Sequence, residues 1–174
     1  MAAASAPAPS RLPVPAPGAP AFPEVQVNTT MGSFTVELYA THAPKTCNNF
    51  LELARRGYYD NVVFHRIIPD SFVQGGDPTG TGMSGSDKPD LKAEFNSEPH
   101  TRGTCSMART QVPDSANSQF FIMFAPGHFL NGQYTVVGEV TEGMDVVDAI
   151  KRGAGRNGEV MGQPDRMVSV TVTE

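Results

Sequence analysis

The chain has 174 residues, 39% of them hydrophobic, and a formal net charge of −5, which suits a single domain with its own core. Because the charge is negative and no basic block stands out, the composition argues against a nucleic-acid partner or an anionic membrane surface. No run approaches the roughly 18 apolar residues of a membrane-spanning helix. The sequence therefore predicts a protein outside the membrane, with a monomer as the default state.

The N-terminal segment, residues 1–23, is rich in alanine and holds seven of the 15 prolines. Such a segment buries too little apolar surface to offset its ordering entropy, so we predict a disordered, partly polyproline-II tail. It is either a ligand for a proline-binding module or a passive tail. It lacks the basic region and apolar run of a secretory signal. Together with only two cysteines, Cys47 and Cys105, this favours a cytoplasmic location and two free, buried thiols.

The rest of the chain, residues 24–174, is predicted to form one domain. Apolar residues alternate along residues 25–29 and 34–38 on either side of a short turn, which is the pattern of a β-hairpin. A helix follows between Pro44, which suits a first helical turn, and Gly57, which suits the position past a helix end. One face of this helix is apolar at helical spacing, through Cys47, Phe50, Leu51 and Ala54.

A second helix is expected over residues 143–152, ended by Gly153, with Met144, Val147 and Ile150 on its inner side. Six more segments have the composition of strands, namely residues 62–68, 72–75, 104–108, 119–123, 135–140 and 167–173. Eight strands with only two helices predict a mainly β fold, a closed eight-stranded antiparallel β-barrel capped by two α-helices. The long connection at residues 78–103 is expected to be functional or mobile.

Several kinds of chemistry are disfavoured by the motifs. The four histidines are far apart, with no cysteine or carboxylate at ligand spacing, so no metal site and no cofactor is predicted. No nucleophile, phosphate-binding loop or dinucleotide motif is recognisable. What remains is a set of polar residues on apolar strands. Alternation predicts that Phe64, Arg66 and Ile68 share one strand face, and that Gln119 and Phe121 share another.

The sequence around Arg66 resembles the signature of the cyclophilins, a family of peptidyl-prolyl cis–trans isomerases. The signature runs are VFHRIIP at residues 63–69 and VQGGD at residues 73–77. Further matching motifs follow in the family's order at residues 106–108, 117–122, 129–132 and 137–144. The resemblance covers residues 25–172, and several long motifs in register make a chance match very improbable.

The resemblance implies an eight-stranded barrel with a groove on its outer surface, where X–Pro bonds of peptides and unfolded proteins are rotated without a cofactor. Cyclosporin-type macrocycles are further candidate ligands. By matching position, the catalytic residues are Arg66, Gln74 and Gln119. The substrate-binding residues are Phe72, Ala108, Arg109, Phe121, Phe129, Leu130 and Tyr134. Phe129 stands where the family usually has tryptophan, so the loss of an indole donor predicts weaker cyclosporin binding.

One position departs from the family in a way that bears on activity. Ser71 stands where the family usually has a phenylalanine in the floor of the proline pocket. Losing that ring removes apolar contact worth a few kcal/mol at most, so weaker binding of the substrate proline is expected. Two functions remain open: an isomerase that assists protein folding, favoured by Arg66, Gln119 and Phe121, and a module that binds proline-containing loops with weak catalysis.

Overall fold

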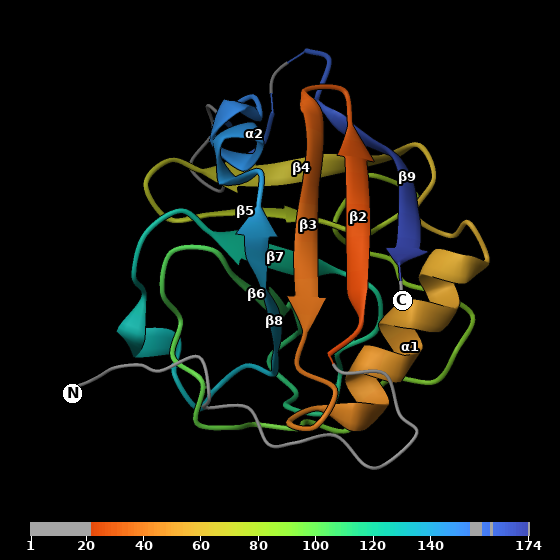
Figure 1. Ribbon diagram of the computed structural model, residues 1–174, viewed down its shortest axis with the longest axis vertical. Helices are drawn as coiled ribbons and strands as arrows, with labels where there is room; N and C mark the ends of the chain where they lie inside the picture. The colour runs from red at the N-terminus through yellow and green to blue at the C-terminus, as the bar shows by residue number, and fades with distance from the viewer. Residues whose placement is uncertain (1–21, 154–157, 161, 174) are drawn as a thin grey trace.

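A computed structural model describes residues 22–153, 158–160 and 162–173 of the chain (Figure 1). Eight antiparallel strands close into a barrel in the order β2-β3-β8-β6-β7-β5-β4-β9, which confirms the predicted fold class. The predicted tail at residues 1–23 lies outside the described residues, apart from Phe22 and Pro23. No helix in the described part of the chain is long and apolar enough to cross a membrane.

Every predicted strand is present, and most boundaries lie within two residues of those expected. The strands are β2 (Glu24–Thr29), β3 (Gly32–Leu38), β4 (Val62–Ile68), β5 (Phe72–Gly75), β6 (Thr104–Met107), β7 (Phe120–Met123), β8 (Val136–Glu142) and β9 (Arg166–Thr173). The helices are α1 (Pro44–Arg55), the 3-10 turn η2 (His128–Leu130) and α2 (Met144–Ala149). The turn η2 is the one described helical element that the sequence pattern did not indicate.

Helix α1 follows its sequence signals closely. It begins at Pro44 and ends just before Gly57, whose φ of 72° is a conformation that glycine adopts readily. Its predicted apolar face is buried. Helix α1 packs against β9 and α2 against β3, and the two helices lie at opposite ends of the barrel (Figure 1).

Helix α2 is shorter than predicted, because it ends at Ala149 rather than Arg152. Ile150 already has an extended backbone, with ψ of 135°, and is buried. Beyond it, the N–H of Gly153 donates to the carbonyl oxygen of Ile67 at 3.1 Å. The chain therefore leaves the helix early because its backbone pairs with the edge of β4.

The predicted alternation along β4 was wrong in one respect. Phe64 pairs with Gly75 and Arg66 pairs with Gln74, so two steps along β4 oppose one step along β5. This is a β-bulge with His65 as the additional residue, and a bulge turns the following side chains to the other face. Phe64 and Ile67 are consequently both fully buried, whereas Arg66 does not share the face of Phe64.

The barrel interior is filled by aromatic and aliphatic side chains from the strands, from α1 and from the turn that follows α1, the largest being Tyr59, Phe34, Phe50, Phe64 and Phe120. Cys47 and Cys105 lie within this core and are both free, as predicted. Burial raises the pKa of both thiols, that of Cys105 to about 12. Both side chains therefore behave as small neutral apolar groups.

Candidate active site

The bulge in β4 brings Arg66 onto the outer face of the barrel beside β5. Its Nη1 donates to Oε1 of Gln74 at 3.3 Å. The Cζ atom of the same guanidinium lies 5.1 Å from the centre of the Phe72 ring, within range of a cation–π contact. Arginine is always protonated in proteins. A fixed cation therefore stands at the end of an apolar surface.

The two predicted glutamines form one hydrogen-bonded chain with Arg66. Gln74 Nε2 donates to Gln119 Oε1 at 2.9 Å. Gln119 Nε2 in turn donates to the carbonyl oxygens of Gly82 at 3.0 Å and Ser84 at 2.9 Å. Backbone carbonyls only accept, so the nitrogen of Gln119 must face them and its oxygen must face Gln74. The same logic directs the oxygen of Gln74 toward Arg66.

Next to this chain lies an aromatic cluster made of Phe72, His100, Phe121 and Tyr134. Phe121 is at its centre, with ring centroids 5.3 Å from Phe72, 5.6 Å from Tyr134 and 6.0 Å from His100. Phe120 and Ile122 on either side of it belong to the barrel core, so alternation directs Phe121 outward. The cluster therefore covers the outer face of the barrel beside Arg66, and Gln74 pairs directly with Phe121.

His100 belongs to this cluster although no sequence signal indicated it. The residue is fully buried. Its ring nitrogens lie 3.1 Å from Oδ1 of Asn131 and 3.0 Å from the hydroxyl oxygen of Ser106. Burial lowers the pKa of His100, which favours the neutral ring. Because Oδ1 of Asn131 also accepts the backbone N–H of His100, the proton of the neutral ring belongs on Nδ1.

Phe72 supplies an aromatic ring where Ser71 has none. Ser71 is half-buried in the turn between β4 and β5. Its N–H donates to Ile68 O at 3.0 Å, and its carbonyl accepts the N–H of Phe124 at 2.8 Å. Val73 is in the core, so Phe72 shares the outer face with Gln74. The Phe72 ring thus lies between Arg66 and Phe121, on the face where an aromatic floor was expected to be missing.

Arg109 and Ala108 border the cluster on the side of β6. The guanidinium of Arg109 lies over Tyr134, with Cζ 4.7 Å from the ring centre. It also donates from Nε and Nη2 to the carbonyl of Gln133, at 2.9 and 2.8 Å. The N–H of Ala108 donates to Gln119 O at 3.0 Å. The N–H of Ala108 is therefore already used within the barrel and is not available to a bound peptide.

The two predicted residues on η2 lie at the rim. Leu130 is half-buried, and its N–H donates to Gly127 O at 2.9 Å. Phe129 is 77% exposed, so little of its ring packs against other residues. The structure therefore brings Arg66, the two glutamines, Phe72, Phe121 and Tyr134 together and leaves Phe129 outside the packed cluster.

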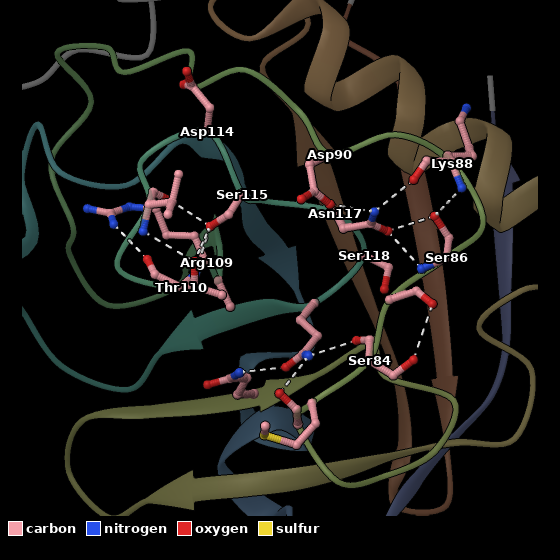
Figure 2. Close-up of a pocket in the computed structure, with 17 residues that line it drawn as sticks. Ser84, Ser86, Lys88, Asp90, Arg109, Thr110, Asp114, Ser115, Asn117 and Ser118 are labelled. Carbon is pink, nitrogen blue, oxygen red and sulfur yellow. Dashed lines mark hydrogen bonds between the residues drawn. The ribbon is translucent and has the colours of Figure 1, made fainter.

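On the far side of Gln119 is a polar pocket of about 530 Å³, drawn in Figure 2. Asn117 holds one wall: its Oδ1 accepts from the N–H of Ser86 at 2.8 Å and its Nδ2 donates to the carbonyl of Lys88 at 3.0 Å. The lining carries both charge signs, through Lys88, Arg109, Asp90 and Asp114. Sequence motifs did not indicate this pocket, because two loops from separate parts of the chain form it.

The cysteines and histidines do not offer a metal centre. Within the described residues, no group of three or more His, Cys, Asp or Glu side chains is arranged to hold a metal ion. His65 has two buried ring nitrogens without a hydrogen-bond partner in the structure, and burial lowers its pKa. The groups gathered around Arg66 are its own guanidinium, two amides and aromatic rings.

The model of the cyclophilin type peptidyl-prolyl cis-trans isomerase family matches residues 24–172. A probable peptidyl-prolyl cis-trans isomerase of Brucella suis is 47% identical over 152 residues, which are 81% of this chain and 78% of the relative. The isomerase CYP18-2 of Arabidopsis thaliana is 54% identical over 129 residues, 72% of this chain and 78% of the relative.

Among solved structures, a cyclophilin type peptidyl-prolyl cis-trans isomerase of Cryptosporidium parvum aligns with a TM-score of 0.81 and 30% identity, covering 88% of this chain and 98% of the other. A second structure of that protein, determined in the presence of the dipeptide Ala-Pro, aligns with a TM-score of 0.79. Family, relatives and fold agree with the geometry around Arg66. The chain is a member of the cyclophilin family of peptidyl-prolyl cis–trans isomerases.

Proposed function

We propose that this isomerase rotates X–Pro bonds without a covalent step, by stabilising the twisted amide with Arg66. The barrier is about 18–20 kcal/mol, because rotation breaks the amide resonance. In the twisted amide the proline nitrogen becomes pyramidal and accepts a hydrogen bond. A guanidinium held beside that nitrogen stabilises the twisted state more than either planar state. The observation that carries the proposal is the hydrogen bond that holds Arg66 on Gln74 next to the Phe72 ring.

The neighbouring groups support a proposed place for each part of the substrate. The aromatic cluster offers an apolar surface for the proline ring around Phe121, with Leu130 and Phe129 at its rim. Gln74 orients Arg66 and faces the substrate backbone. The residues before proline extend past Arg109 toward the polar pocket, which lies next to Gln119. Holding the ring while the preceding carbonyl turns is the arrangement that rotation of one bond requires.

The physiological substrates are proposed to be proline-containing peptides and unfolded proteins, so that the enzyme assists protein folding. X–Pro exchange takes tens of seconds or more without a catalyst, which is slow enough to limit folding. The Ala-Pro dipeptide present with the Cryptosporidium parvum relative supports this substrate class. The two free thiols support a reducing, cytoplasmic location.

Cyclosporin-type macrocycles are proposed as ligands of the same surface. Their binding is expected to be weaker than in family members that carry tryptophan at the place of Phe129. The exposed Phe129 ring has no donor for a hydrogen bond. An inhibition constant equal to that of a tryptophan-bearing member, measured in the same assay, would contradict this view.

The direct test of the function is the rate of cis-to-trans exchange of Ala-Pro and Gly-Pro peptides, with Arg66→Ala as the matched variant. We expect a rate well above background for the parent chain and a rate near background for the variant. No acceleration by the parent chain would overturn catalysis. Peptide binding without acceleration would favour the alternative function, a module that binds proline-containing loops.

A further inference from the structure

Asp77, two residues beyond the end of β5, has a fully buried carboxylate that holds the loop next to Gln119. Its Oδ2 accepts the backbone N–H of Gly82 at 2.7 Å and that of Ser84 at 3.2 Å. The hydroxyl of Thr81 lies 3.2 Å from the same oxygen. Its Oδ1 accepts the N–H of Thr79 at 2.8 Å. One carboxylate thus gathers donors from four residues of the loop.

Two of these loop residues, Gly82 and Ser84, also contact Gln119. The carbonyl oxygens of Gly82 and Ser84 both accept from Nε2 of Gln119, at 3.0 and 2.9 Å. Gly82 and Ser84 therefore each use their N–H for Asp77 and their C=O for Gln119. Because Asp77 fixes these two residues, it also fixes the two acceptors that orient the Gln119 amide. Figure 2 shows Ser84 on this loop, beside the chain of dashed hydrogen bonds.

We propose that Asp77 is a positioning residue for catalysis: it holds the Gly82 and Ser84 carbonyls that orient Gln119, and through Gln119 and Gln74 it sets the position of the Arg66 guanidinium. Every link of this path is a direct hydrogen bond between 2.7 and 3.3 Å. The inference rests on the proposed role of Arg66 and adds a buried anion to the groups that determine its geometry.

Asp77 itself is rigidly placed relative to Gln119. Gly76 has φ of 107°, and a Cβ on it would lie 2.4 Å from the carbonyl oxygen of Ser118. The hydroxyl of Ser118 donates back to the carbonyl of Gly76 at 2.8 Å. The backbone before Asp77 and the backbone before Gln119 therefore touch directly, so the carboxylate and the amide share one frame.

The ionised form of the Asp77 carboxyl group suits the proposed positioning role. Burial acts to raise the pKa of Asp77, but hydrogen bonds from the Thr79 hydroxyl and from the N–H groups of Thr79, Ser84 and Gly82 outweigh it and lower the pKa. A carboxylate offers acceptors only, which matches a set of loop groups that are all donors. Asparagine has nearly the same shape, but its NH₂ group would face those donors and release part of the loop.

The test compares Asp77→Asn with the parent chain in the X–Pro exchange assay. We expect kcat to fall about tenfold while KM changes less than about twofold, because the aromatic cluster is not touched. Asp165→Asn is the matched control, since Asp165 also caps a loop, accepting from the Thr30 hydroxyl at 2.8 Å and from the Lys151 N–H at 2.7 Å. We expect this control to leave kcat unchanged.

A double-mutant cycle separates positioning from general loosening of the fold. If Asp77 acts through Gln119, Asp77→Asn lowers kcat less than about twofold in a Gln119→Ala background. Full additivity of the two changes, or an unchanged kcat in Asp77→Asn alone, would overturn the inference. Neither of these two outcomes would contradict the proposed isomerase function, provided that Arg66→Ala still abolishes exchange.

Thr79→Val provides the same test should Asp77→Asn fail to fold. The Thr79 hydroxyl lies 2.8 and 2.9 Å from the two carboxylate oxygens, and valine keeps the size of the side chain. We expect kcat to fall about two- to threefold, and this loss to vanish in the Gln119→Ala background. A loss of the same size in both backgrounds would count against the path through Gln119.

Discussion

The aromatic cluster and the polar pocket lie on either side of Gln119, but they are built in different ways. The rings of Phe72 and Phe121 come from β5 and β7, whose backbones pair directly. The polar pocket is lined by loops that depend on side-chain hydrogen bonds, such as those of Asn117 to Ser86 and Lys88. The register of the barrel therefore sets the apolar surface, whereas a few polar contacts set the shape of the pocket.

The proposed catalytic cation, Arg66, depends on both regions. Arg66 is on a strand, yet its orientation depends on a hydrogen-bonded path that ends in the loop at Gly82 and Ser84. Changes on the strand side should therefore alter how tightly proline is held. Changes on the loop side should alter the orientation of the Arg66 guanidinium. The first kind of change should appear mainly in KM and the second mainly in kcat, so the two can be measured separately.

The largest effect on activity is expected at Arg66, which links the aromatic cluster to the loops of the polar pocket. Arg66→Ala should lower kcat/KM for X–Pro exchange by at least about 100-fold, because it removes the charge that is proposed to stabilise the twisted amide. Arg66→Lys should recover little, since a compact ammonium lacks the planar fork that reaches Gln74 and the substrate together. Retention of most activity in Arg66→Ala would show that another group stabilises the twisted amide.

The next effect tests the aromatic cluster. Phe121→Leu should raise KM about five- to tenfold with kcat within about twofold, because the proline ring loses aromatic surface worth roughly 1 kcal/mol. Phe129→Leu is the matched control, since Phe129 is 77% exposed at the rim, and its KM should change far less. Equal changes in KM for the two variants would mean that the substrate does not distinguish the cluster from its rim.

A change in the polar pocket should affect stability more than chemistry. Asn117→Ala removes four hydrogen bonds, to Ser86 N and Oγ, Lys88 O and Asp90 Oδ1. We expect the free energy of unfolding in urea to fall by about 1–3 kcal/mol. Asn48→Ala on the exposed side of α1 should stay within about 0.5 kcal/mol of the parent. If both variants unfold at the parent's urea concentration, Asn117 does not hold the pocket wall.

A smaller effect is expected where the sequence departs from the family. Ser71→Phe should lower KM by no more than about two- to threefold, since Phe72 already lies beside Phe121. Phe72→Ala should have the opposite and larger effect on KM. A gain of tenfold or more in Ser71→Phe would show that Phe72 does not replace the missing ring, and that the parent chain binds proline poorly.

The smallest effect concerns the two cysteines in the barrel core. With the pKa of Cys105 raised to about 12, only about one thiol in 10⁴ is ionised at pH 8. A thiol reagent should therefore leave both cysteines and the isomerase activity unchanged at that pH, and react with two thiols once guanidinium unfolds the chain. Rapid reaction of the native protein would reveal an opening of the barrel near these residues.

Strands and helices with regular periodicity were predictable from the sequence, and α1 shows why. Its first turn, its apolar face and its end are each encoded within a dozen neighbouring residues. The prediction failed for the faces of β4, because a bulge depends on the partner strand and leaves no mark in the alternation. It also failed for the end of α2, where a hydrogen bond to Ile67 outweighs the helical preference of the next residues.

The sequence by itself determined the family and the strands of the barrel, and it predicted the roles of Arg66, Gln74 and Gln119, because these features are contained in contiguous motifs. Only the tertiary structure decided that the Phe72 ring lies between Arg66 and Phe121, that His100 joins the aromatic cluster and that Asp77 binds the loop residues whose carbonyls accept from Gln119. These relations link residues from separate loops and strands. The physical reason is that a linear pattern specifies local conformation and burial, whereas contacts across the barrel depend on how the closed sheet brings distant segments together.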